Sequence, residues 1–393
     1  MSASLPQPRE KSPLGSAENA TSYSVCLYHG GLAAALERFV QRVWPKDLSA
    51  RFQASVSEPP SSPIFLFLKG PEVIGHIATV PVRLHSPSGI HVAYWVVGFM
   101  VLPEYRNGPI GPLLVKKVNE TLDCALTLHV EEAPLKIFKG MGWKHAGVIP
   151  QYVLVCDAYA FLKNIRLGQV PRLRDRSGTG STLLSAMLAQ PPVRLVVAFL
   201  ASIALKGFSL AAAILKPARG SGTVTEESGF DEGYNLLWEK VTHKYDALVV
   251  RNRSYLEFRY GTRMKNYRLL AYREKGELLG YCIVKLKQFI DDPRMGRMRV
   301  GTIVDCLFDP ADLHGLQSLL TDAMRLCKRE AVETIFCTAS YAPLRRLLRV
   351  NGFIEIPGNL NFAYLDKMKS VQPDISLDSW HLMRGDSDAD ANF

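Results

Sequence analysis

The sequence predicts an α+β protein made of two tandem domains, each with a mostly antiparallel mixed sheet flanked by helices. A chain of 393 residues is long enough for two domains, and a hydrophobic content of 47% is enough to fill their cores. Both halves show the same order of patterns: a helix, three strands, a helix, a strand and a second short helix. This order predicts one central crossover in each half.

Matching positions in the two halves support a duplicated fold. An apolar run that ends in proline, a Lys-Gly turn, and a glycine followed by an aromatic residue each occur twice. The pairs are residues 97–103 with 304–310, Gly70 with Gly276, and Gly142 with Gly352, which lie 207, 206 and 210 positions apart. Three anchors with nearly constant spacing predict that one structural unit is repeated.

Composition divides the chain into five segments. The first is polar and contains Pro and Ser, so we expect it to be disordered, whereas the third is basic and then apolar, which indicates a helical connector. The last segment is acidic. The segments are residues 1–21, domain 1 at 22–157, the connector at 158–230, domain 2 at 231–368 and the tail at 369–393.

In the first half, apolar residues that recur every three or four positions predict helices, and short apolar runs between turns predict strands. Pro45 ends the first helix, and a Pro/Ser cluster at 57–63 predicts a loop. The helices are expected at 31–43, 113–118 and 133–141, and the strands at 64–69, 73–84, 90–102, 125–130 and 143–155.

The second half follows the same rules. Its helices are expected at 231–242, 313–330 and 342–350, and its strands at 269–272, 278–286, 299–308 and 334–338. Residues 217–229, which precede it, are rich in Gly, Ser and Thr and predict a linker.

The turn after the third strand of the first half predicts an anion site. The apolar strand ends at Pro103, a basic turn carries Arg106, Gly108 and Gly111, and a helix pattern follows. The first N–H groups of a helix have no partner within the helix and carry a partial positive charge, so anions bind there. Glycine lets the backbone approach such an anion closely.

This turn resembles the pyrophosphate loop of the GNAT superfamily of N-acyltransferases, whose pattern is Arg/Gln-x-x-Gly-x-Gly/Ala. Arg106 and Gly111 match, whereas Pro109 stands at the middle glycine and Gly108 lies one place earlier. A second family signature is a helix that begins with alanine and ends in glycine and an aromatic residue, here residues 133–143. The tyrosine that many members use as a general acid falls at Phe138, which has no proton to give.

The resemblance implies an acyl-CoA cosubstrate, such as acetyl-CoA, held by the first half, and no metal. Strand amides would pair with the pantetheine arm, the turn would hold the pyrophosphate, and the second helix would lie beside the cofactor. The implied cofactor residues are Met100, Val101, Leu102, Arg106, Asn107, Gly108, Ile110, Gly111, Pro112 and Phe138. In the second half, Asp312 would repel a pyrophosphate.

Acid–base candidates follow two of the strands. His129, Glu131 and Glu132 come directly after the fourth strand of the first half. Asp305 lies on the central strand of the second half, where GNAT enzymes often place a carboxylate base, and its first-half counterpart is Gly98. The alternative is that Asp305 bonds backbone or an arginine. It would join the other three only if both sheets face one pocket.

The segment 255–260 and the ending at 378–390 resemble a group of bacterial tandem-GNAT proteins that finish in Trp-x-Leu-x-x-Gly-Asp-x-Asp. Such proteins are associated with cell-surface polysaccharide synthesis, which implies an amino sugar or a polysaccharide precursor as acceptor. The tail either folds back so that Asp386 and Asp388 bind a substrate amine, or it is structural or solvated.

Charge and cysteine content bound the partners and the compartment. The net charge is +10 with a pI near 9.2, which favours anionic partners. No basic-aromatic stripe points to RNA, so no nucleic acid is expected. Seven cysteines without a CxxC pair, and no signal peptide, indicate a cytoplasmic protein.

Residues 161–216 combine a basic stretch with a long apolar stretch. Three interpretations stay open: a helix packed between domains, a peripheral anchor on the inner membrane surface, and a membrane span. The uninterrupted apolar part, residues 195–205, is shorter than the roughly 20 residues that a span needs.

These features together predict an acyl-CoA-dependent N-acyltransferase that transfers an acetyl group to an amine. Two alternatives remain. The departures at Pro109, Phe138 and Gly98 also fit a catalytically degenerate binding or assembly protein. The basic charge fits a tandem-GNAT aminoacyl transferase that uses charged tRNA.

Overall fold

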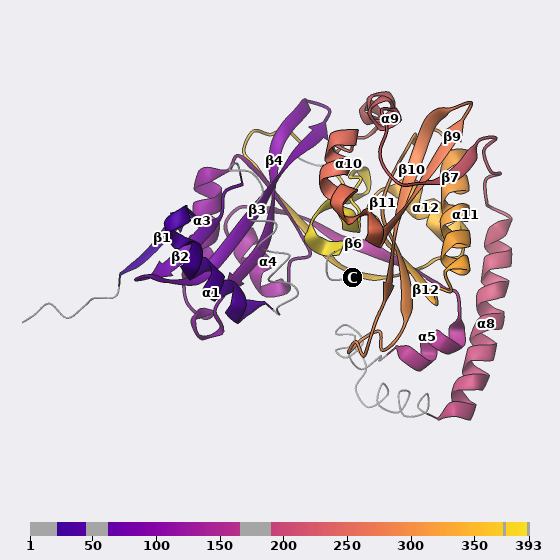
Figure 1. Ribbon diagram of the computed structural model, residues 1–393, viewed down its shortest axis with the longest axis horizontal. Coiled ribbons are helices and arrows are strands. Elements are labelled where there is room, and N and C mark those ends of the chain that lie inside the picture. The colour runs from indigo at the N-terminus through magenta and orange to yellow at the C-terminus, as the bar shows by residue number, and fades with distance from the viewer. Residues whose placement is uncertain (1–21, 45–61, 166–189, 372–374, 391–393) are drawn as a thin grey trace, which may run out of the picture.

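The computed structural model describes residues 22–44, 62–165, 190–371 and 375–390. Within these ranges the strands form one continuous 13-stranded sheet with the path β1-β2-β3-β4-β5-β13-β6-β12-β11-β10-β9-β7, and β8 pairs with β3. The sheet opens into two sides, one built mainly from each half of the chain, and the C-terminal segment lies between them (Figure 1). Helices flank both sides, so the predicted α+β class with a mixed sheet is confirmed.

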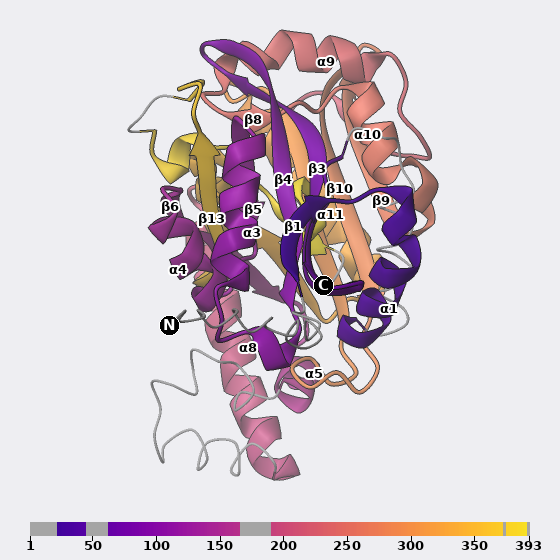
Figure 2. The ribbon, with the colours of Figure 1, turned by 90° about the vertical axis from the view of Figure 1, so that its left-hand side faces the viewer.

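The first half contains six strands and three helices among the described residues. The strands are β1 (Tyr23–Leu27), β2 (Phe65–Lys69), β3 (Glu72–Ser86), β4 (Gly89–Val101), β5 (Cys124–Leu128) and β6 (Lys144–Val155). The helices are α1 (Ala33–Val43), α3 (Ile110–Thr121) and α4 (Glu132–Gly140). Helix α3 packs on β2, β3 and α4, and α1 packs on β3 (Figure 2).

The connector contributes helices α5 (Ala158–Asn164) and α8 (Pro191–Ala213). In the second half the helices are α9 (Gly233–Val241), α10 (Arg253–Tyr260), α11 (Leu313–Arg329) and α12 (Ala342–Val350). The strands are β7 (Thr223–Glu227), β8 (Leu248–Val249), β9 (Tyr267–Glu274), β10 (Glu277–Gln288), β11 (Arg299–Phe308), β12 (Thr334–Thr338) and β13 (Ile354–Asp366).

The last strand of each half is exchanged with the other half. Strand β13 pairs antiparallel with β5, with Phe362 opposite Leu128, whereas β6 pairs antiparallel with β12, with Tyr152 opposite Cys337. The two exchanged strands also pair with each other. A buried cluster that includes Trp95 joins the halves across this junction.

Several sequence expectations change in detail. The segment predicted as a linker, residues 217–229, contains β7, which pairs with β9 at the edge of the sheet. The 255–260 segment belongs to helix α10. The predicted disordered segment 1–21, most of the loop at 57–63 and residues 166–189 lie outside the described residues. In the part of the chain that the structure describes, no helix is long and apolar enough to span a membrane.

Candidate functional site

Strands β4 and β5 separate soon after they meet. They run parallel and pair only at Tyr94 with Ala125 and at Trp95 with Leu126. From residue 96 to the end of β4, the described residues provide no strand partner on the side facing β5, although β3 continues to pair on the other side. Backbone groups on this side of β4 therefore remain available to a ligand.

A bulge re-aims the backbone of β4 at this opening. The register with β3 shifts between His76 and Ala78, and Gly98 has a φ of 59°, which favours glycine. The imidazole Nδ1 of His76 lies 2.8 Å from the carbonyl oxygen of Gly98. Because a carbonyl can only accept, Nδ1 donates, and burial lowers the pKa of His76 to about 4. A neutral histidine thus fixes the bulge.

The predicted cofactor turn lies at the open end of β4. Arg106 is exposed, and its Nε donates to the carbonyl oxygen of Val101 at 3.0 Å. The N–H of Gly108 bonds Tyr105 at 3.2 Å, so this amide is already used. Helix α3 begins without a side-chain cap. Among the described residues, no backbone acceptor faces the N–H groups of Ile110 and Gly111, and Pro112 has none to donate.

Strand alternation narrows the predicted pantetheine contacts. The N–H of Leu102 donates to Ile74 on β3 at 3.0 Å, so this amide is not available to a ligand. Successive residues of a strand point their backbone groups to opposite sides, which leaves Val101 directed toward the opening while Met100 pairs with His76. Of the three residues predicted to pair with the pantetheine arm, only Val101 therefore directs its backbone N–H toward the opening.

Two of the predicted cofactor residues also support the local packing. A Cβ on Gly111 would lie 2.9 Å from the terminal methyl of Ile137 and 3.4 Å from the ring of Phe99, so a larger residue would require the Ile137 side chain to shift. Phe138 is fully buried, with its ring 5.6 Å from Phe99 and 4.6 Å from Trp143. It lies in the core of the first half, behind Phe99.

The acid–base candidates of the first half lie together at the end of β5. His129 has a φ of 65°, Glu131 is the N-cap of α4, and Glu132 is the first residue of that helix. All three are exposed. Desolvation by the surrounding protein lowers the pKa of His129, the nearby cation of Arg384 lowers it further, and Glu131 raises it. His129 is therefore held as a neutral imidazole that can accept a proton.

The equivalent opening in the second half is filled by the tail. Strands β11 and β12 run parallel from Val300 to Ile303 and then separate. Residues 380–386 enter between them: Met383 bridges to Ala339, and His381 Nε2 lies 2.7 Å from the carbonyl oxygen of Cys306. A Cβ on Gly385 would lie 2.8 Å from the Val304 oxygen. The tail segment 380–386 is called the tail plug below.

The start of helix α11 is covered as well. Asp312 caps it, with its Oδ1 accepting from the N–H of Gly315 at 2.9 Å. The segment before β7 lies across this end, where the N–H of Gly220 meets the His314 carbonyl at 3.1 Å and the Ser318 Oγ at 3.0 Å. A carboxylate and a chain segment thus occupy the place where an anion would bind.

Asp305 lies in a buried ion network and not with the other acid–base candidates. Arg251 Nε donates to Asp305 at 2.9 Å, and Arg251 Nη2 reaches both carboxylate oxygens of Asp386 at 2.7 and 2.8 Å. Tyr260 donates to the other Asp305 oxygen at 3.2 Å. Burial opposes the charge on Arg251, but the two carboxylates raise its pKa well above the usual value. Asp305 therefore bonds an arginine, which is one of the two roles that the sequence left open for it.

The two tail aspartates that were considered for amine binding differ in surroundings. Asp386 is buried against Arg251, whereas Asp388 is exposed, although desolvation by the surrounding protein raises its pKa to about 6. Nearby, Asp390 accepts from Tyr267 at 2.6 Å and pairs with Arg259. Of these three aspartates, Asp388 is the one that is exposed to solvent.

Sequence reasoning missed Arg251, which holds the tail plug in place. The residue directly follows the apolar run 247–250, and that run was the one indication that its side chain would be buried. A charged side chain is almost never buried without a partner of opposite charge. A search for carboxylates on other apolar segments that could pair with Arg251 could therefore have found this network.

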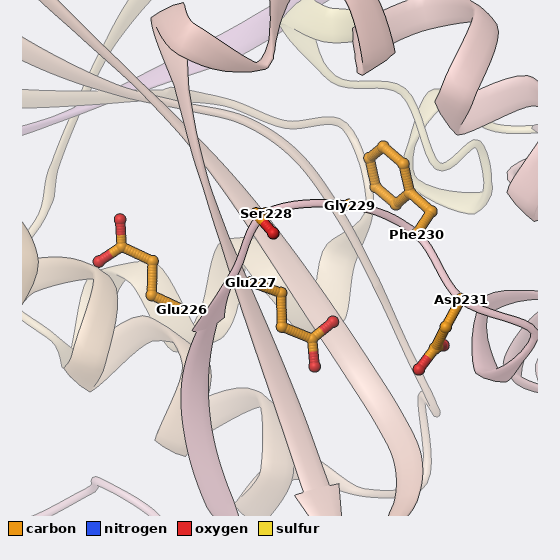
Figure 3. A pocket seen from close by; sticks show the side chains of 6 residues that line it. All are labelled: Glu226, Glu227, Ser228, Gly229, Phe230 and Asp231. Carbon is orange, nitrogen blue, oxygen red and sulfur yellow. The ribbon is translucent and has the colours of Figure 1, made fainter.

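A surface depression of about 460 Å³ follows β7 and lies apart from these residues. Figure 3 shows its lining, in which Phe230 points away from the carboxylates of Glu227 and Asp231. Both carboxylates already pair with Arg273, at 2.8 and 2.7 Å. Its charges are therefore satisfied within the protein, and it does not form part of the candidate site.

No protein-family model matches the chain, and no curated protein sequence matches it. Solved structures do match. A GCN5-related N-acetyltransferase from Anabaena variabilis has a TM-score of 0.55 at 9% identity, covering 87% of this chain and 72% of that one. A conserved Enterococcus faecalis protein of unknown function, described as a probable N-acyltransferase, has a TM-score of 0.54 at 11% identity, covering 88% and 73%.

A third match is the Saccharomyces cerevisiae N-myristoyltransferase with bound myristoyl-CoA. Its TM-score is 0.50 at 11% identity, and the alignment covers 89% of this chain and 84% of that one. At identities of 9–11%, the similarity to these three proteins shows a shared fold. The chain therefore adopts the fold of the GCN5-related N-acetyltransferases.

Proposed function

We propose that the protein is an acyl-CoA-dependent N-acyltransferase that binds its cosubstrate on the first half. One observation carries this proposal: among the described residues, β4 has no strand partner at this opening and α3 has no side-chain cap, whereas the equivalent places in the second half are filled. The likeness to proteins named as acyltransferases agrees with it.

The uncovered groups suit the parts of an acyl-CoA. The pyrophosphate would lie at the start of α3, against the N–H groups of Ile110 and Gly111, with the Arg106 guanidinium beside it. The pantetheine arm would extend along β4 and accept from the outward N–H of Val101, since the carbonyl oxygen of Val101 already accepts from Arg106. This places the thioester near the bulge at Gly98, where a backbone N–H can polarise the thioester oxygen.

The reaction is attack of an amine on the thioester carbon, which forms the amide and releases the CoA thiolate. His129, neutral because of its lowered pKa, is the proposed acceptor of the amine proton. Glu131 and Glu132 lie beside it and would attract a cationic acceptor. We propose an amine acceptor, with an amino sugar as the class carried over from the resemblance of the tail.

Calorimetric titration with acetyl-CoA tests the cosubstrate and its location. The parent protein should bind, and Arg106→Glu and Gly111→Trp should each weaken binding at least about tenfold, since the first reverses a charge at the pyrophosphate and the second fills the turn. The matched control is Arg346→Glu, which makes the same charge change at an exposed position of α12.

The control should bind acetyl-CoA as the parent does. If the parent binds none of a series of acyl-CoA lengths, the enzyme proposal is wrong. If only the control loses binding, the second half is the cosubstrate half. Thiol release in the presence of a panel of amines and amino sugars then separates an enzyme from a protein that binds acyl-CoA without turnover, and His129→Gln should lower the rate without changing affinity.

A further inference from the structure

Helix α8 lies along the outside of the second half and touches the protein with one narrow face. It packs against α5 and α12, at the outer edge of the molecule (Figures 1 and 2). The packed face carries mostly small side chains: Ala198 is buried, and Ala201, Ser202 and the larger Leu205 are half-buried. The hydroxyl of Ser202 donates to the Ala198 carbonyl at 2.7 Å within the helix. The helix is therefore not packed between the two halves.

The opposite side of α8 carries large apolar side chains that no described part of the chain covers. Leu195, Phe199, Ile203 and Leu210 are 61%, 65%, 54% and 76% exposed. Leu195, Phe199 and Ile203 follow one another at intervals of four, so they form a stripe along one face. Exposed apolar residues flank this stripe or continue it past the helix end: Val196, Val197, Leu200, Ile214 and Leu215.

This distribution is the reverse of an ordinary surface helix. Such a helix turns its large apolar residues to the core and its charges to water. Among the described side chains of α8, mostly small residues face the protein and most of the large apolar residues face outward. The helix has 23 residues and is roughly 35 Å long. Apolar patches of this extent are rare on soluble monomers and mark an interaction surface.

Charge restricts the partner. Residues 161–216 hold eight Lys or Arg and a single acidic residue, Asp175, which gives +7 of the whole chain's +10. Residues 190–216, which include α8, hold Arg194, Lys206 and Lys216 and no acidic residue. A second copy of the chain docking through this helix would therefore bring like charges together, which is unfavourable. An anionic lipid surface supplies both an apolar layer for the exposed side chains and negative headgroups for the cations.

We propose that the outward face of α8, here named the α8 stripe and defined by Leu195, Phe199, Ile203 and Leu210, binds the surface of an anionic phospholipid bilayer. The helix would lie in the plane of the headgroups, with the stripe in the acyl boundary and the packed face still on α5 and α12. The folded body would then hold the candidate site at a membrane surface, independently of whether that site is catalytic.

Flotation with vesicles tests the proposal. The full-length protein should float with vesicles of phosphatidylcholine and phosphatidylglycerol in equal parts, and much less with phosphatidylcholine alone. Leu195→Asp and Phe199→Asp should each weaken binding at least about tenfold, because they place a carboxylate in the acyl boundary. The matched control is Leu236→Asp on α9, since Leu236 is 60% exposed, as Leu195 is.

The control variant should float as the parent does, and molar salt should release the parent from the vesicles because surface attraction is screened. Equal flotation of the stripe variants and the parent would overturn the proposal, as would no flotation of the parent. Retention in molar salt would indicate an inserted helix instead of a surface one. Acyl-CoA affinity should be the same in Phe199→Asp, so failure here is distinguishable from failure of the proposed function.

Discussion

The two openings of the sheet, between β4 and β5 and between β11 and β12, share a geometry and differ in what fills them. In each, two parallel strands pair briefly and then separate. In the first half, no described strand pairs with the separated part of β4 and no described side chain caps α3, whereas in the second half the tail plug and Asp312 occupy both places. One fold can therefore keep its strands apart in one half and fill the equivalent opening with core in the other.

The central strands of the two halves, β4 and β11, also differ in the residue that they carry at the matching position. Gly98 on β4 forms a bulge and has no side chain, whereas Asp305 on β11 is tied to Arg251 and Tyr260. Both oxygens of this carboxylate are therefore engaged within the fold, one by a buried cation and the other by a hydroxyl. The carboxylate of the second half therefore belongs to the attachment of the tail plug.

The largest effect is expected from the arginine that holds the plug. Arg251→Met leaves Asp305 and Asp386 buried without a cation, which should lower the free energy of unfolding by about 3–5 kcal/mol in denaturant titrations. Adding Asp305→Asn and Asp386→Asn should recover a large part of the loss because no unpaired charge remains. A single variant as stable as the parent would show that the network does not hold the tail.

Buried histidines predict how stability depends on pH in both halves. His76 and His381 each face a central-strand carbonyl, and burial lowers their pKa values to about 4 and about 3. Because the unfolded chain binds these protons more tightly, stability should be full above pH 6.5 and fall as pH decreases toward 4, by roughly 3 kcal/mol for His76.

Denaturant titrations between pH 7.5 and 4.5 measure this slope. His76→Asn and His381→Gln keep a donor at the same ring position and should each flatten it. If the first variant flattens the slope and the second does not, the plug opens before the histidine titrates. Unchanged slopes in both variants would contradict the assignment of neutral, buried imidazoles.

An exchange at the start of α3 makes the first half resemble the second. Pro109→Asp places a carboxylate at the N-cap of α3, the position that Asp312 holds in α11. The introduced carboxylate should weaken acetyl-CoA binding by about tenfold or more in calorimetry, while the helix gains a cap. Pro109→Ala, which is uncharged, should bind nearly as the parent does. Equal binding by both variants would exclude the start of α3 as the pyrophosphate site.

The smallest effect is expected from the reverse exchange. Asp312→Ala removes the cap of α11 and should lower the free energy of unfolding by about 1 kcal/mol, whereas Asp312→Asn should lose less. Neither variant should gain acyl-CoA binding at the second half, because residues 218–220 still cover the helix start and the tail plug still fills the opening. A new binding site in Asp312→Ala would show that the carboxylate alone keeps the second half closed.

Sequence patterns predicted the elements whose boundaries are local. Strands 299–308 and 334–338 and helix 342–350 have the bounds expected from their apolar runs and from the Pro310 and Gly352 that end them. The sequence did not predict strand β7, because four of its five residues, Thr223–Glu227, are polar and follow a Gly/Ser-rich stretch that is typical of a linker. Apolar periodicity and Pro or Gly residues predict an element correctly where its structure depends mainly on its own residues.

Pairing partners and buried charges could not be predicted in the same way. Nothing in the residues of β6 or β13 indicates that each pairs with the other half, because strand pairing depends on distant segments. The candidate residues His129, Glu131 and Glu132 do lie together, since they are neighbours in sequence. Asp305 lies apart from them, because its surroundings are set by Arg251 and by the tail, far along the chain.

The exchange of β6 and β13 also affects how the chain can fold during synthesis. Strand β5 gains its neighbour β13 only after Phe362, the partner of Leu128, has emerged from the ribosome 234 residues later. Such distant pairings slow folding and leave a strand edge exposed in the meantime. The first half is therefore expected to acquire its final stability only after nearly the whole chain has been made, so that neither half released alone would be a complete folding unit.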